Sequence, residues 1–263
     1  MRSFNASTAA DLEPVASVLA ELSRRADECG VEIMVVGATA RDILIRHVVG
    51  SVPERATADI DVAVAVSSWS DLRQLTEPFV RRKGSEHKFE VQQTEVDVIP
   101  FGAIEDASRT ITWPDDHRMN VFGFQEAMAA AVHVTFPGNL VVPVASLPAQ
   151  SVLKLLAWQD RHHDNRRDAI DLKSIVYAYH EGPYLEQLYV DHQELIETHE
   201  FDPKLAGAHR IGREARSLLA PENLGLVTAL LDSPEQFALL AADMGGMVRE
   251  NRSILLAYRK GFA

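Results

Sequence analysis

Apolar residues in the first half of the chain recur with two spacings, one typical of helices and one typical of strands. Over residues 10–28, apolar positions three and four apart predict an amphipathic helix. A short β-branched run over 31–36 predicts a buried strand, and alternating acidic and aliphatic residues over 58–66 predict another. Helical and strand patterns therefore follow one another in this half, which indicates mixed α and β structure.

The other expected elements divide the chain near residue 146. Before it we expect a helix over 39–49, a loop over 50–57, a helix over 67–79 capped by Ser67 or Ser68, a turn over 81–85, strands over 89–93 and 95–101, irregular chain after Pro100, and a hairpin of 132–136 and 140–144. After it we expect four or five helices, separated by Gly182-Pro183, Asp202-Pro203, Pro221 and Ser233-Pro234. The sequence predicts an α+β fold: a small mixed sheet flanked by helices over 1–145, and a mostly helical C-terminal domain over 146–263.

The composition is that of an ordinary globular protein. Of 263 residues, 46% are hydrophobic and 24% are charged, which suffices for a core that needs no disulfide. The single cysteine, Cys29, fits a reducing compartment, and we find no secretory signal. No apolar run approaches 18 residues, so we expect a cytoplasmic protein without a membrane span.

The net charge of −12 excludes nucleic-acid binding through the overall field of the protein. Local basic patches could still bind nucleic acid, although each can equally be a solvated helix face. The candidates are Arg161, His162, His163, Arg166 and Arg167, and then Arg210, Arg213 and Arg216.

Acidic residues in apolar surroundings give the strongest chemical signal. In a strand, Asp59 and Asp61 point to the same side while Ile60 points to the other. Two such carboxylates repel each other, and a divalent cation such as Mg²⁺ or Mn²⁺ removes the repulsion. The alternative is an exposed strand face or a turn.

Asp97 lies in a second apolar run, Val96-Asp97-Val98-Ile99-Pro100, where a carboxylate needs a partner. If this strand lies beside the one with Asp59 and Asp61, the three carboxylates converge. Two would hold a metal ion, and Asp97 could take the proton of an attacking hydroxyl group. The alternative for Asp97 is a salt-bridged acid in the core.

A small-residue turn precedes these acids. Gly37-Ala38-Thr39 stands between an expected strand and an expected helix, where backbone N–H groups can bind phosphate. The turn matches neither the P-loop pattern nor the dinucleotide-binding glycine pattern.

A lysine in the second half stands among leucines. Lys154, Trp158 and Arg161 share one helix face, and Lys154 could neutralise phosphate charge. Asp168 or Asp171 could orient Lys154 or Arg161. The alternative is a helix pair closed by structural ion pairs. Neighbouring His162 and His163 point apart, so we expect no zinc site there.

Together, Val36-Gly37-Ala38-Thr39-Ala40-Arg41, Asp59-Ile60-Asp61 and Asp97 resemble the nucleotidyltransferase superfamily with a polymerase-β-like core. The stretch from Lys154 to Arg161, followed by Arg167-Asp168 and Asp171-Leu172, is similar to the AbiEii/AbiGii toxin-like members. The resemblance covers roughly residues 30 to 180, with Ala38 where the family usually has Gly or Ser.

This resemblance implies a nucleotidyltransferase that uses a nucleoside triphosphate (NTP) and Mg²⁺ or Mn²⁺. It implies that Asp59, Asp61 and Asp97 hold the metal and, with Lys154, form the catalytic set. The nucleotide-binding positions would be Gly37, Ala38, Thr39, Arg41, Lys154 and Asp168. Toxin members modify RNA, notably tRNA ends, or act in phage defence, often beside an antitoxin.

We therefore expect transfer of a nucleoside monophosphate (NMP) to an acceptor hydroxyl group, with pyrophosphate release. Two alternatives remain: a small-molecule, antibiotic-type nucleotidyltransferase, which the net acidity favours, and a catalytically silent nucleotide-binding regulatory module. The acceptor, the preferred base and the oligomeric state do not follow from the sequence.

Overall fold

The computed structural model describes residues 3–51 and 59–263, and the chain divides into two compact units. The first unit contains the described residues within Met1–Asp42 and Arg55–Ser146. The second contains those within Ile43–Glu54 and Leu147–Ala263. Most of the loop expected over 50–57, and the first residue of the strand expected over 58–66, lie outside the described residues.

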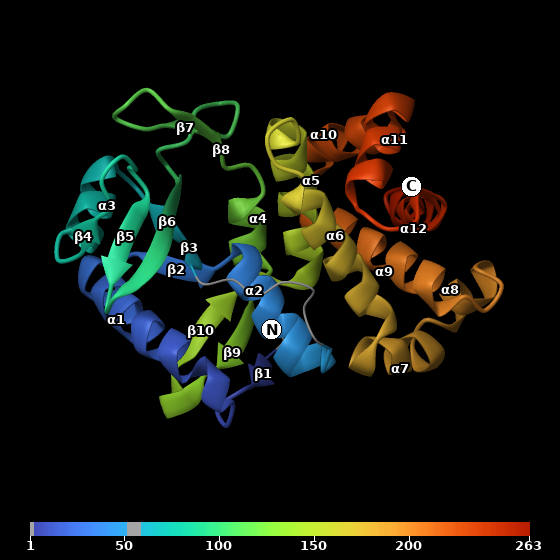
Figure 1. The fold of residues 1–263 in the computed structure, drawn as a ribbon, viewed down its shortest axis with the longest axis horizontal. Helices are drawn as coiled ribbons and strands as arrows, with labels where there is room; N and C mark the ends of the chain where they lie inside the picture. The colour runs from blue at the N-terminus through green and yellow to red at the C-terminus, as the bar shows by residue number, and fades with distance from the viewer. Residues whose placement is uncertain (1–2, 52–58) are drawn as a thin grey trace. The chain divides into compact units, whose positions relative to one another are not determined.

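An eight-stranded mixed sheet forms the centre of the first unit, in the order β1-β9-β10-β2-β3-β6-β5-β4 (Figure 1). The strands are β1 (Ser3–Asn5), β2 (Glu32–Val35), β3 (Ile60–Val66), β4 (Val80–Arg81), β5 (Lys88–Val91), β6 (Thr94–Gly102), β9 (Val132–Thr135) and β10 (Val141–Val144). Central β3 runs parallel to β6 and antiparallel to β2. The expected mixed sheet and α+β fold class are confirmed.

Aliphatic side chains of the central strands form the core of this unit. In β3, Val62 and Val64 are fully buried, as are Val96 and Val98 in β6. The flanking helices are α1 (Glu13–Cys29), α2 (Gly37–Leu44), α3 (Trp69–Thr76) and α4 (Phe124–Ala129). The expected serine cap of α3 is confirmed at Ser68, which forms a capping box with Asp71.

Several short elements differ from the expectations. The chain after Pro100, expected to be irregular, forms the hairpin of β7 (Thr110–Thr112) and β8 (Arg118–Asn120), followed by α4. The turn expected over 81–85 begins inside a strand, because β4 includes Arg81. The helix expected over 39–49 begins earlier, at Gly37, and its end is a π-helix, Ile45–Val49. Elements of two or three residues are too short to show a hydrophobic period, so the pattern missed them.

The second unit contains eight α-helices within the described residues, more than the four or five expected. They are α5 (Leu147–Arg161), α6 (Arg167–Tyr177), α7 (Gly182–Val190), α8 (Gln193–Thr198), α9 (Pro203–Leu218), α10 (Pro221–Asp232), α11 (Pro234–Asp243) and α12 (Val248–Lys260). Four helices begin at the expected Gly-Pro or Pro positions. The missed breaks lack proline: at Asn165, for example, the side chain accepts a hydrogen bond from the Arg167 N–H, and α6 begins there. No helix in the described parts of the chain is long and apolar enough to cross a bilayer.

Candidate active site

Asp61 lies against the turn that leads from β2 into α2. Its carboxylate Oδ2 accepts a hydrogen bond from the Ala38 N–H, with an N···O distance of 3.2 Å. Its carbonyl accepts one from the Val36 N–H at 2.9 Å. Gly37 has a φ of +62°, and a Cβ atom there would lie 2.2 Å from Asp61 Oδ2. Only glycine combines this backbone conformation with the close approach of the carboxylate.

Asp97 lies beside Asp61. The parallel strands β3 and β6 pair Asp61 directly with Asp97 in register. Paired residues of neighbouring strands are about 4.8 Å apart and project to the same face of the sheet. The structure therefore brings together two of the three predicted acids, and it does so by strand pairing alone.

A lysine that the sequence analysis overlooked accompanies Asp97. Lys88 is the register partner of Asp97 in β5, and its Nζ lies 3.0 Å from Asp97 Oδ1 in an ion pair. Lys88 also donates a hydrogen bond to Glu95 Oε1 at 2.6 Å. Burial acts to lower the pKa of Lys88, but the two carboxylates outweigh it and raise that pKa above its usual range. His87 Nε2 lies 4.0 Å from Asp97 Oδ2, and burial lowers the pKa of this histidine despite the aspartate.

The position of Lys88 opposite Asp97 depends on the turn between β5 and β6. Gln92 and Gln93 both have positive φ angles, 50° and 67°, and form the two-residue connection between β5 and β6. Such a connection fixes the register and sets Lys88 opposite Asp97. The sequence analysis expected a short connection at residue 94 instead, because two glutamines are not the usual residues of such a turn.

The third acid precedes the strand. Asp59 lies in a bend before β3, and its carbonyl accepts a 2.9 Å hydrogen bond from the Thr39 hydroxyl. Arg41 is 3% exposed and donates to Asp42 Oδ1 from Nε at 2.8 Å and from a terminal nitrogen at 2.6 Å. Among the residues that the structure describes, no three His, Cys, Asp or Glu side chains are gathered as a ready metal site.

Two carboxylates at this position nevertheless suit a divalent cation. Asp61 and Asp97 supply the hard oxygen ligands that Mg²⁺ and Mn²⁺ prefer. The buried Oδ1 atom of Asp97 accepts no hydrogen bond from the described residues and contacts only the Lys88 charge. These residues fit a metal ion that displaces Lys88 from Asp97.

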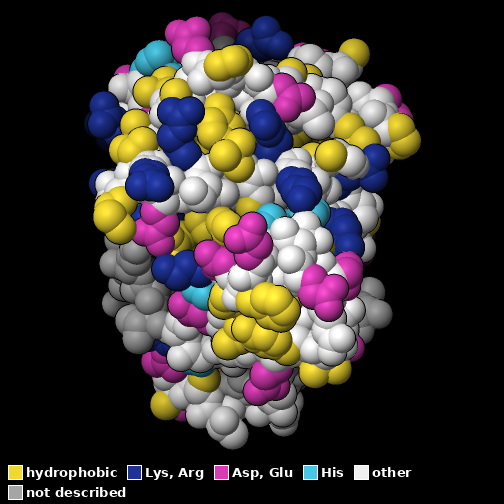
Figure 2. All heavy atoms as spheres, turned by 90° about the vertical axis from the view of Figure 1, so that its right-hand side faces the viewer, with side chains coloured by type: hydrophobic (Ala, Val, Ile, Leu, Met, Phe, Trp, Pro, Cys, Tyr) yellow, Lys and Arg dark blue, Asp and Glu magenta, His cyan; other side chains and the backbone are white. Residues whose placement is uncertain are grey.

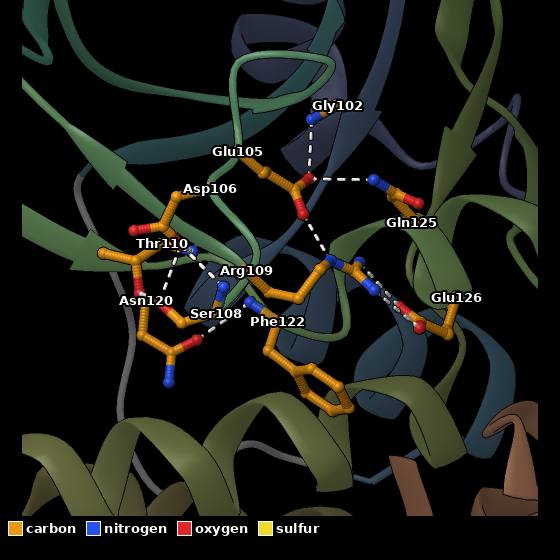
Figure 3. Close-up of polar contacts among 10 residues, drawn as sticks. All are labelled: Gly102, Glu105, Asp106, Ser108, Arg109, Thr110, Asn120, Phe122, Gln125 and Glu126. Atoms are coloured by element: carbon orange, nitrogen blue, oxygen red, sulfur yellow. Dashed lines mark hydrogen bonds and ion pairs between the residues drawn. The ribbon is translucent and has the colours of Figure 1, made fainter. Parts of the chain in front are cut away.

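A polar cluster ties the end of β6 to α4 (Figure 3). The Gly102 N–H donates to Glu105 Oε1 at 2.6 Å, and Gln125 donates to the same oxygen at 3.0 Å. The Arg109 guanidinium bridges Glu105 and Glu126, with both distances to Glu126 at 3.2 Å. Burial opposes the charge of Arg109, but the two glutamates raise its pKa. This cluster fastens the end of β6, the strand that carries Asp97, to α4.

In the second unit, Lys154 is held by two buried acids. Its Nζ lies 3.0 Å from Asp168 Oδ1 and 2.7 Å from Asp171 Oδ2. Arg161 binds both oxygens of Asp168, at 2.6 and 2.9 Å. Burial acts to raise the pKa of Asp168, and the two cations outweigh it and lower that pKa. The expected pairing of these aspartates with Lys154 and Arg161 is present.

Most of the predicted basic patches are occupied by contacts within the protein. His162 is buried and stacks on Trp158, and Arg166 pairs with Asp243 at 3.2 Å. Arg210 is 1% exposed and bonds to Glu214 at 2.8 Å. Burial and ion pairing therefore use these three side chains within the protein, and nucleic-acid binding by the other members of the two patches stays a prediction.

A family match over most of the chain identifies the protein as a nucleotidyltransferase, and the sheet with its paired acids lies within the matched residues. Residues 19–252 match the family described as "Nucleotidyl transferase AbiEii toxin, Type IV TA system". The chain belongs to this AbiEii family. No curated protein matches the chain.

Solved structures with similarity to the chain are distant. The enzyme ANT(2″)-Ia, in complex with adenylyl-2″-tobramycin, is 14% identical, with a TM-score of 0.41 over 75% of this chain and 98% of its own. The lincosamide antibiotic adenylyltransferase LnuA, bound to lincomycin, is 17% identical, with a TM-score of 0.36 over 60% and 94%. The Thermotoga maritima CCA-adding enzyme complexed with tRNA is 14% identical, with a TM-score of 0.28 over 100% and 85%.

Proposed function

We propose that the protein transfers an NMP from an NTP to a hydroxyl group of an RNA acceptor and releases pyrophosphate. The observation that carries the proposal is the register pairing of Asp61 with Asp97 beside the Gly37 turn. Membership of the AbiEii toxin family supports the reaction class, and its toxin description supports a cellular acceptor such as tRNA or another RNA. The type IV toxin–antitoxin description also supports a cognate antitoxin as a partner.

In this proposal Asp61 and Asp97, with Asp59 as the third acid, hold Mg²⁺ or Mn²⁺. The ion would offset triphosphate charge and favour ionisation of the acceptor hydroxyl. Lys88 is the counter-ion of Asp97 before the metal binds. A cation that enters must therefore compete with the Lys88 ammonium for the same carboxylate.

The reaction forms one bond and breaks one. The acceptor hydroxyl oxygen attacks the α-phosphorus, the bond from that phosphorus to the bridging oxygen breaks, and pyrophosphate leaves. Asp97 accepts the hydroxyl proton. The N–H groups of Gly37 and Thr39 at the start of α2 face the phosphates, since Asp61 occupies the Ala38 N–H.

The nucleotide-binding roles of Arg41, Lys154 and Asp168 remain predictions. Lys154 is paired with two carboxylates, so its ammonium is already balanced when no nucleotide is present. A nucleotide-binding role requires that Lys154→Met raises the KM for NTP. A purely structural role predicts lower stability with an unchanged KM.

The test is incubation with each α-labelled NTP, Mg²⁺ and total RNA, beside a reaction without RNA. The wild-type protein is expected to label RNA, Asp61→Asn to leave it unlabelled, and the exposed control Asp115→Asn to act as wild type. Label that appears without RNA, in an added aminoglycoside or other small hydroxyl compound, would instead support the antibiotic-type alternative. NTP binding with no label in any acceptor would support the silent regulatory module.

A further inference from the structure

Helix α12 in the second unit carries a concentration of positive charge. Helix α12 contains Arg249, Arg252, Arg259 and Lys260 and only one acid, Glu250, which binds Lys204 at 3.0 Å. This is unusual in a chain with a net charge of −12. Phosphate binding by such an acidic protein requires a local surface of this kind.

The exposed residues of α12 form one stripe. Arg249, Arg252, Leu256 and Lys260 are all exposed, and spacings of three and four place them on one side of the helix. With a rise of about 1.5 Å per residue, the stripe extends over roughly 16 Å. Its length suits several consecutive phosphates of an extended strand.

Helix α9 packs directly against α12. The two helices run parallel, because Lys204 meets Glu250 and Gly212 meets Tyr258. A Cβ on Gly212 would lie 2.1 Å from the Tyr258 carbonyl oxygen, so the two backbones are in contact. Arg216, one turn after Gly212 in α9, is exposed.

Three cations of the α12 stripe form no ion pair within the described residues. They are Arg249, Arg252 and Lys260, which we call the basic face. By contrast, Arg213 beside them binds Glu194 at 3.1 Å, and Arg210 is buried. The cations of the basic face are therefore available to a ligand.

Exposed apolar side chains lie on α12, at its start, and in Phe201, three residues before the Lys204 that binds Glu250 of α12. Leu256 is 47% exposed and Met247 is 69% exposed at the start of α12. Phe201, in the connection between α8 and α9, is 69% exposed and has a φ of +62°, which is rare for an aromatic residue. Figure 2 shows Lys and Arg side chains gathered on this side of the molecule with hydrophobic side chains between them.

We infer that the basic face binds a single-stranded segment of the acceptor RNA, with Phe201 as a stacking platform for a base. This inference rests on the proposed function for its ligand. Cations that contact the backbone, alternating with exposed apolar groups, are the usual means of binding single strands without a sequence code. An acidic protein partner would bind the cations of the basic face but would not need the exposed ring of Phe201.

The experiment is a titration of fluorescent single-stranded RNA with full-length protein at several salt concentrations. Arg249→Ala/Arg252→Ala is expected to weaken binding about tenfold and to reduce the slope of log K against log salt by about 1.4. The matched control is Arg73→Ala/Lys83→Ala, which removes two exposed charges from the first unit and should bind as wild type. Equal losses in both double variants, or none in either, would overturn the inference.

A second variant separates stacking from charge. Phe201→Ala is expected to weaken RNA binding at least fivefold and to leave binding of inorganic polyphosphate unchanged. Equal effects on both ligands, or competition by polyglutamate but not by RNA, would reject RNA as the ligand. Neither titration measures catalysis. If the proposed function is wrong, the wild-type protein would bind RNA but would not transfer an NMP to it.

Discussion

Replacement of Gly37 by alanine should damage the site through a single added carbon. The Cβ would lie 2.2 Å from Asp61 Oδ2, where ordinary contacts begin near 3.4 Å. The Asp61 carboxylate would have to retreat by about 1 Å, and it would lose its hydrogen bond from the Ala38 N–H. A misplacement of this size costs on the order of 10²-fold in rate.

The stability cost has two parts. A non-glycine residue at positive φ costs about 1–2 kcal/mol, and loss of the hydrogen bond to the Asp61 carboxylate about 1.5–3 kcal/mol. The chain offers a matched control in Gly30, which has a similar φ of +66° but no atom within 4 Å of an added Cβ. Gly30→Ala should lose only the first part and keep its activity.

The assay is incorporation of labelled NMP, together with denaturant unfolding of both variants. We expect Gly37→Ala to lose about 10²-fold in rate and Gly30→Ala to match wild type. Equal activity in the two variants would refute the reasoning that the turn exists to admit Asp61.

Three other predictions concern charge. Lys88→Gln removes the competing cation from Asp97, so the Mn²⁺ concentration for half-maximal activity should fall roughly five- to tenfold. An unchanged Mn²⁺ concentration would contradict competition between Lys88 and the metal ion. Asp168→Asn leaves Lys154 with one buried acid and should lower the free energy of unfolding by about 2–4 kcal/mol in a denaturant titration, whereas the exposed Asp164→Asn should not. Burial and the charges of nearby groups lower the pKa of His209 to about 4, so the unfolded chain alone binds this proton between pH 6.5 and 4. Stability should fall as the pH falls through that window, by roughly 1–2 kcal/mol after allowance for partial exposure, and His209→Asn should flatten this dependence in unfolding curves.

The sequence was informative where one feature controls both local structure and chemistry. The alternation in β3 and the apolar run in β6 predicted buried strands, and their pairing places Asp61 beside Asp97. The strand before Gly37 and the helix after it were predicted, although α2 already begins at Gly37. The closest partner of Gly37 proved to be the Asp61 carboxylate, a contact that depends on tertiary packing and leaves no local pattern.

Other features depend on distant partners and could not be read from the chain. Arg210 has the sequence appearance of a surface arginine, yet it is buried and bonded to Glu214 and Gln187. Arg252 and Lys260 belonged to no patch singled out in the sequence, because they are eight residues apart and share a face only once α12 has formed. Charge was visible in the sequence, but its pairing was not.

The central claim is that Asp61 and Asp97 act as one site. The most direct measurement is a double-mutant cycle of Asp61→Asn and Asp97→Asn, with NMP incorporation as the readout and unfolding curves as the check on folding. Residues that act as a unit are strongly non-additive, so each single variant should lose most of the activity and the double variant little more. A loss in the double variant equal to the product of the two single losses would contradict a shared site. Full activity in either folded single variant would also contradict it.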